Sequence, residues 1–129
     1  MPVRIEYTKD KIGVVLHHEG VVSGEELINS VSKVYSDERY LNLRYWIGDR
    51  TSCTEFLPDT RSLKIIAELS KQESSRNPGI LLALVAPNDL EFGMSRMFEF
   101  LAGESLFITK VFRARSTADK WIRQGLETP

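Results

Sequence analysis

The chain has few cysteines and no large excess of charge of either sign. It has one cysteine among 129 residues, so no internal disulfide can form, as is usual in a reducing compartment. Acidic and basic residues nearly balance, at 18 and 17, and neither sign forms a block. This argues against nucleic acid or an anionic membrane as a partner.

Long apolar segments are also missing. The longest apolar run, GILLALVA at 79–86, is far too short to span a bilayer. The N-terminal MPVRIEYTKDK lacks the apolar core of a signal peptide, so we expect a cytoplasmic location and no membrane insertion. With 42% hydrophobic and 27% charged residues, the composition is that of one globular domain over 1–129.

Strand-like and helix-like segments alternate along the chain. Two strands separated by a short turn predict a hairpin, and each of three later strands is followed by a helical pattern. The expected strands are 3–7, 12–20, 41–49, 80–86 and 106–112, and the expected helices are 23–37, 58–74, 90–104 and 116–127. This order predicts an α/β fold, with an N-terminal β-hairpin, consecutive βα units and a mostly parallel five-stranded sheet with four helices.

Capping residues and apolar stripes support the helices. Ser23 with Glu26 and Ser116 with Asp119 match the capping box, Asp59 or Thr60 and Asn88 or Asp89 are expected caps, and Pro78 ends a helix. The expected inward residues are Leu27, Val31, Val34 and Tyr35, then Leu63, Ile66 and Ala67, then Leu90, Met94, Met97, Phe98 and Leu101, and finally Ala118, Trp121 and Ile122.

The strand at 80–86 has no polar position, which is typical of a strand covered on both faces. Consecutive right-handed βα units place their helices mainly on one face of the sheet. A crossing helix, the N-terminal hairpin or another subunit must therefore cover the second face, and this makes a homodimer a possible partner arrangement.

The chain resembles the SpoIIAA-like family of the STAS (sulfate transporter and anti-sigma-factor antagonist) superfamily. The resemblance lies in LRYWIGD at 43–49, LLALVAPNDLEFGMSRMFEFLA at 81–102 and VFRARSTADKWI at 111–122, and in the element order. It implies a compact sheet of consecutive parallel strands and a regulatory domain that binds a protein partner. In such proteins a serine just after a strand-ending Asp is phosphorylated and partner binding is then lost. Asp49 matches that Asp, whereas Arg50-Thr51-Ser52-Cys53 replaces the usual turn and no Gly follows.

Three interpretations of the stretch at 49–54 remain open. As a partner-binding or phosphoacceptor site it offers Asp49, Arg50, Thr51, Ser52 and Thr54. As a nucleophile site it would use Cys53, which needs a lowered thiol pKa. As an ordinary βα loop it would be polar and exposed and carry no chemistry.

A second candidate surface lies on the helix at 89–103. Phe92, Arg96 and Phe100 recur every four residues, beside the apolar stripe expected to face the core. These residue types are enriched at protein interfaces, so we expect either a wide core contact or a partner or homodimer surface.

The sequence contains no phosphate-binding glycine loop, hydrolase elbow or cysteine–histidine metal spacing. His17 and His18 would point to opposite faces of a strand, so we expect neither a metal site nor a cofactor. We therefore expect a non-enzymatic regulatory or protein-interaction domain.

The alternative is a small-ligand module that binds an apolar or anionic molecule between sheet and helices. It would have Arg50 or Arg113 on the rim. A pocket of roughly 300 Å³ or more, lined by Met94, Met97 and Phe98, would favour it.

Overall fold

The strands lie in the sheet in the order in which they occur along the chain. The computed structural model describes residues 2–127. β1 and β2 pair antiparallel, and every later neighbour pair is parallel. The strands are β1 (Val3–Tyr7), β2 (Gly13–Val22), β3 (Tyr45–Phe56), β4 (Leu81–Val85) and β5 (Ile108–Phe112). The predicted α/β architecture is confirmed.

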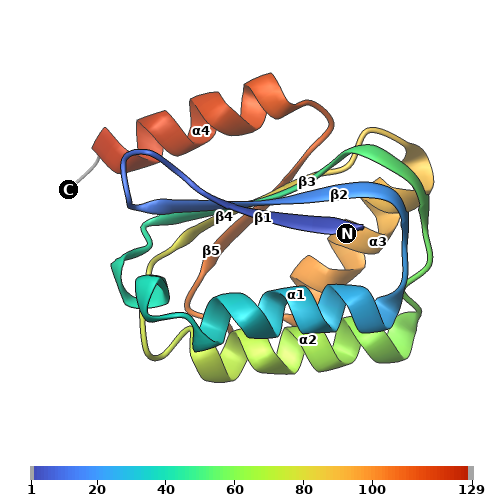
Figure 1. Ribbon diagram of the computed structural model, residues 1–129, viewed down its shortest axis with the longest axis horizontal. Helices are drawn as coiled ribbons and strands as arrows, with labels where there is room; N and C mark the ends of the chain where they lie inside the picture. Colours follow the sequence, from blue (N-terminus) through green and yellow to red (C-terminus); the bar gives the residue numbers. More distant parts are fainter. Residues whose placement is uncertain (1, 128–129) are drawn as a thin grey trace.

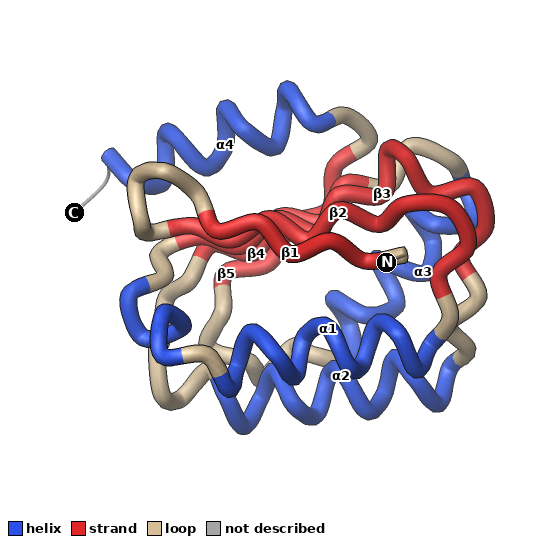
Figure 2. Tube along the Cα trace, viewed as in Figure 1, coloured by secondary structure: helices blue, strands red, loops and turns tan. Residues whose placement is uncertain are grey.

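Helices cover both faces of this sheet (Figures 1 and 2). α1 and α2 lie side by side on one face with α3 beside them, and α4 lies alone on the opposite face. The helices are α1 (Gly24–Ser36), α2 (Thr60–Glu73), α3 (Asp89–Leu101) and α4 (Arg115–Glu127), with a short 3₁₀ turn η1 (Glu38–Asn42). None of the helices in the described range 2–127 is long and apolar enough to span a membrane.

Local capping fixes where three helices begin. Ser23 and Glu26 form the predicted capping box, with reciprocal side chain to backbone bonds of 3.2 and 3.0 Å. Asp59 caps α2 and Asn88 caps α3. The capping box predicted for the last helix is wrong, because α4 begins at Arg115, one residue before Ser116.

α4 is the cover that the second face of the sheet requires. Its Ala118 and Ile122 are buried against a separate apolar cluster on that face, and Trp121 packs at the edge of the cluster. The cluster's sheet members are Val15, Tyr45, Ile47, Leu81, Ala83, Val85 and Phe112. The crossing helix was one of the three expected solutions, so covering this face requires no second subunit.

β3 is longer than the sequence predicts. The strand was expected to end at Asp49, but 50–56 continue it and pair with the end of β2 as far as Val22 and Phe56. β4 reaches only Val85, opposite Asp49, so the ends of β2 and β3 form a two-stranded ribbon beyond the sheet. Residues 49–54 are therefore a paired strand and not the exposed loop of the third interpretation.

The buried face of α3 also differs from the expected one. Leu90 and Met97, expected inside, are 69% and 42% exposed. Phe98 is buried as expected, but the other buried residues of the helix are Glu91 and Ser95. The helix is rotated so that the polar side chains of Glu91 and Ser95 face the sheet, where Arg50 of β3 bonds Ser95.

Replacing Ile122 by alanine tests the role of α4. Ile122 is 4% exposed, so the truncation should lower the free energy of unfolding by about 2–4 kcal/mol, measured by urea denaturation. The neighbouring exposed Arg123→Ala is the matched control and should change it by less than about 0.5 kcal/mol. Equal effects of the two substitutions would contradict the packing of α4 on the sheet.

Candidate functional site

A bulge in β3, just after Asp49, sets the direction of the side chains that form the candidate site. His17 of β2 pairs with Asp49, but Glu19 pairs with Ser52, so β3 holds one extra residue opposite His18. Such a bulge bends a strand and redirects its side chains. The Asp49 carboxylate closes the bulge by accepting a 2.9 Å hydrogen bond from the backbone N–H of Thr51.

Asp49 is also tied to the last helix. Its other oxygen accepts a 3.0 Å hydrogen bond from Arg115, which at the same time donates to Asp119. Burial by itself raises the pKa of Asp49, but the bonds from Thr51 and Arg115 outweigh it and hold the pKa below its ordinary value. Asp49 thus has a structural role, because it links β3 to α4 through its bond with Arg115.

Arg50, next in the chain, turns to the opposite face and is buried under α3. Only 6% of the residue is exposed, and its Nη1 donates to the hydroxyl of Ser95 at 2.9 Å. The guanidinium carbon lies 4.3 Å from the centre of the Phe56 ring, a cation–π contact. In the described range 2–127, no carboxylate lies within 4.0 Å of its nitrogens, and its Nε has no hydrogen-bond partner.

The charge of Arg50 explains the polar face of α3. Burial lowers the pKa of Arg50 to about 10, while the nearby Glu91 and Cys53 oppose this, so the guanidinium is still charged at neutral pH. Glu91 is 3% exposed and bonded through one oxygen to Asn88. Its other oxygen has no partner among the described residues. α3 therefore turns Ser95 and Glu91, not Leu90 and Met97, towards the buried cation.

His18 completes the polar group. It is 2% exposed and its ring stacks on Phe56 at 6.0 Å between centroids. Burial and the positive charge of Arg50 hold the pKa of His18 well below its usual range, so the ring is neutral at pH 7. Its Nδ1 also lacks a partner in the described part of the chain. We call His18, Arg50, Glu91 and Ser95 the buried polar cluster.

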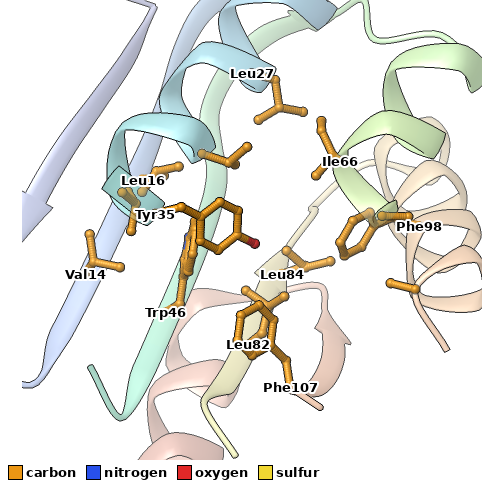
Figure 3. Packing of buried hydrophobic residues seen from close by; sticks show 14 of the residues in the cluster. Val14, Leu16, Leu27, Tyr35, Trp46, Ile66, Leu82, Leu84, Phe98 and Phe107 are labelled. Carbon is orange, nitrogen blue, oxygen red and sulfur yellow. The ribbon is translucent and has the colours of Figure 1, made fainter. Parts of the chain in front are cut away.

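A cavity of about 50 Å³ adjoins this cluster. It lies between the sheet and α1, α2 and α3, and Figure 3 shows the side chains that converge on this region. Arg50 and His18 line one part, and Tyr35 and Ser70, whose hydroxyls are 3.4 Å apart, line another. The remaining lining residues are Leu16, Leu27, Val31, Trp46, Gly48, Leu63, Ile66, Leu82, Leu84 and Phe98.

The cavity matches the expected ligand pocket only in part. It lies between sheet and helices and includes Phe98, but it is far smaller than 300 Å³ and neither Met94 nor Met97 lines it. Arg50 is in its wall and not on an exposed rim, while Arg113 lies outside, bonded to Asp89 at 2.7 Å.

The hydroxyls expected to accept phosphate lie along the ribbon. Thr51, Ser52 and Thr54 are all exposed, and they belong to a paired strand instead of a loop. Cys53 is partly buried beside them. Burial, together with Glu91, raises the pKa of the Cys53 thiol, which is the opposite of what a thiolate nucleophile needs.

The residues proposed as an interface on α3 do not form one continuous exposed stripe. Phe92 is half-buried beneath the guanidinium of Arg113, whose carbon lies 4.1 Å from the ring centre. Arg96 pairs with Glu99 at 3.2 Å, and Phe100 is 84% exposed. His17 and His18 face opposite sides of β2, and no cluster that could hold a metal occurs within residues 2–127.

Three members of the buried polar cluster were missed. Glu91 and Ser95 recur with Phe98 and Ala102 at helical spacing, a stripe that ranks below the more apolar one on hydrophobicity alone. His18 was expected only to lie on the opposite face of its strand from His17. The sequence signal that could have revealed the cluster is Arg50 itself. An arginine directly after an apolar strand can be buried, and it then requires polar partners on neighbouring elements.

The chain matches no family model, no curated protein and no solved structure. What the structure itself defines is an α/β domain with a buried polar cluster beside a small, mostly apolar cavity between the sheet and the helices.

Replacing Asp49 by asparagine should lower the free energy of unfolding at pH 7 by about 1 kcal/mol. Asparagine can still accept from the Thr51 N–H, so mainly the charge facing Arg115 is lost. Because the folded pKa is lowered, the carboxylate stabilises the fold above its ordinary pKa, and this contribution disappears as pH falls through the folded value.

Urea denaturation over a pH series measures this effect, with Asp119→Asn, the other carboxylate on Arg115, as the control. The Asp49→Asn deficit should shrink on acidification. A loss of stability that stays constant with pH, or one equal to that of the control, would contradict this role of Asp49.

Arg50 and Glu91 should be energetically coupled. Arg50→Met alone leaves the Glu91 carboxyl buried without a compensating cation, and should cost about 2–3 kcal/mol of stability. Adding Glu91→Gln should recover most of that loss. A double-mutant cycle by urea denaturation gives the coupling, and strictly additive effects would show that the two groups do not interact.

Proposed function

We propose that the protein is a non-enzymatic module that binds a small carboxylate in the cavity between the sheet and α1, α2 and α3. The single observation behind this proposal is the Nε of Arg50, a buried cationic donor without a partner beside an apolar cavity. Buried polar groups in native proteins are nearly always satisfied, so an unpaired one points to a missing water, ion or ligand. A carboxylate would also compensate the buried positive charge, which water cannot do.

The chemistry of the lining supports a carboxylate with a short apolar part. Its oxygens would accept from the Arg50 Nε and from the protonated nitrogen of the neutral His18. The apolar part would lie against Trp46 and the aliphatic side chains, with Tyr35 and Ser70 at the other polar part of the cavity. A water-sized occupant takes about 10–15 Å³, so a cavity of about 50 Å³ suits acetate or propionate. Longer tails would require α1, α2 or α3 to move outwards.

A protein-interaction role is the second candidate, and one observation favours it. Leu90, Met97 and Phe100 share one side of α3 and are 69%, 42% and 84% exposed. Three large apolar side chains on one exposed helix face are typical of a partner-binding surface. This role is what the resemblance to SpoIIAA-like regulators implies, and the cavity does not depend on it.

A phosphorylation switch at Thr51 or Ser52 has less support from the geometry. A phosphate that docks onto the protein itself needs a nearby free cation. Arg50 is buried beneath α3, and Arg115 is already bonded to Asp49 and Asp119.

Acetate, propionate and butyrate, each compared with its neutral amide, test the carboxylate proposal. At tenfold above its dissociation constant, a fitting acid should raise the melting temperature by about 3–5 °C, whereas its amide should not. NMR cross-peaks of Gly48 and His18, which line the cavity, should shift with the acid.

Glu91→Gln provides the matched background, because it keeps Arg50. Binding should persist in Glu91→Gln and be lost in Arg50→Met/Glu91→Gln. Equal shifts in both variants, or no acid in the series that binds the wild-type protein, would refute the proposal.

A further inference from the structure

β1 is an edge strand whose free side is regular. The Pro2 carbonyl accepts from the Glu19 N–H and the Thr8 N–H donates to the Gly13 carbonyl, at 2.7 and 3.0 Å, so the even-numbered residues of β1 point their backbone groups at β2. The β1–β2 register is uninterrupted from Val3 to Tyr7. In an antiparallel ladder the alternate residues point away, so the N–H and C=O groups of 3, 5 and 7 face the open edge.

The side chains of this short strand are self-complementary. Arg4 and Glu6 lie on one face of β1, with 55% and 51% of their side chains exposed. Within the chain Arg4 contacts Glu19 at 3.4 Å and Glu6 contacts His17 at 2.6 Å. If a second β1 pairs antiparallel about a two-fold axis at Ile5, Val3 lies opposite Tyr7 of the second copy, and Arg4 lies opposite its Glu6. This register brings all three outward-facing residues into hydrogen-bonded positions and forms two symmetry-related Arg4–Glu6 pairs.

Neighbouring registers that also use the outward-facing groups are unfavourable. A shift that centres the axis on Arg4 places two arginines opposite each other, and a shift that centres it on Glu6 places two glutamates together. Like charges directly opposite each other destabilise a strand pair. Charge therefore selects the register centred on Ile5.

We propose that two copies of this chain pair through β1 in that register, so that their sheets join into one continuous sheet. The interface is isologous, as in most two-fold dimers. This inference is independent of the carboxylate proposal, because β1 does not line the cavity.

The helix side of the edge has room for the second copy. A groove of about 1010 Å³ runs between β1 and α1, and its floor includes Val3, Ile5 and Tyr7. Residues directly opposite in a strand pair point to the same face, so the same three side chains of the second copy would enter this groove.

The groove also carries opposite charges near its two ends. α1 follows the end of β2, beside Pro2, and after α1 Arg39 stacks on Tyr7 at 3.6 Å, so α1 runs alongside β1 in the same direction. Glu26 in the first turn and Lys33 in the last both line the groove, and at the Lys33 end Asp37 and Arg39 pair with each other at 2.8 Å. The two-fold axis turns the acidic end of one groove towards the basic end of the other.

The opposite edge of the sheet is built differently. Lys110 stands at the middle of β5, where pairing of β5 with itself about that residue would bring two lysines together. A lysine in an edge strand is a common protection against such pairing. The two edges of the sheet therefore differ, and only β1 has the self-complementary pattern.

Sedimentation velocity of the full chain across the micromolar range tests the dimer by charge reversal. Arg4→Glu and Glu6→Arg each place like charges at both contacts, and each should weaken dimerisation by about tenfold or more. The doubly reversed variant Arg4→Glu/Glu6→Arg should dimerise like the wild type. The two single variants should also associate with each other when mixed.

Ile5→Pro and Lys110→Glu serve as further probes. Ile5→Pro removes an N–H that points away from β2, so it should weaken the dimer while circular dichroism still reports a folded chain. Lys110→Glu, on the other edge, should leave the dimer unchanged. Wild-type protein that is monomeric throughout, or a dimer broken by Phe100→Ser but indifferent to the charge reversals, would overturn the proposal.

Discussion

The arrangement of the helix layer depends on one desolvated cation. Arg50 points into the interior because of the β3 bulge that Asp49 closes. Its buried charge is stabilised there by polar groups of α3, among them the hydroxyl of Ser95. An unpaired buried charge costs several kcal/mol, whereas rotating α3 to expose Leu90 and Met97 sacrifices apolar burial of a few side chains. The orientation of α3 is therefore set by electrostatics, and its apolar residues are left on the surface as a result.

The same bulge links the two faces of the sheet. Asp49 and Arg50 are adjacent, yet Asp49 bonds Arg115 at the start of α4 and Arg50 bonds Ser95 of α3. A displacement of β3 at this point would change both contacts together. An anion that compensates Arg50 would thus act beside the two adjacent side chains that hydrogen-bond β3 to both layers of helices.

Much of the fold could be predicted because its signals are local. The box of Ser23 and Glu26, the breaker Pro78 and the uninterrupted apolar run before Ala86 mark element boundaries without reference to the rest of the chain. The end of β3 could not be predicted in this way, since Thr51, Ser52 and Thr54 lie in a narrow ribbon with exposed side chains and show no apolar alternation. The site was only half predictable: Arg50 was a candidate, but its burial depends on Glu91 and Ser95, more than 40 residues away, and a cavity is a property of packing.

The two tryptophans report on different halves of this molecule. Trp46 packs against Tyr35 in the wall of the cavity, at 5.3 Å between ring centroids, while Trp121 packs against Phe112 beneath α4 at 5.5 Å. The sequence contains no other tryptophan. Intrinsic fluorescence therefore reports on both faces of the sheet at once. Replacing either tryptophan by phenylalanine would leave the emission from one face alone. Unfolding curves of the two variants would then show whether both faces unfold in the same transition.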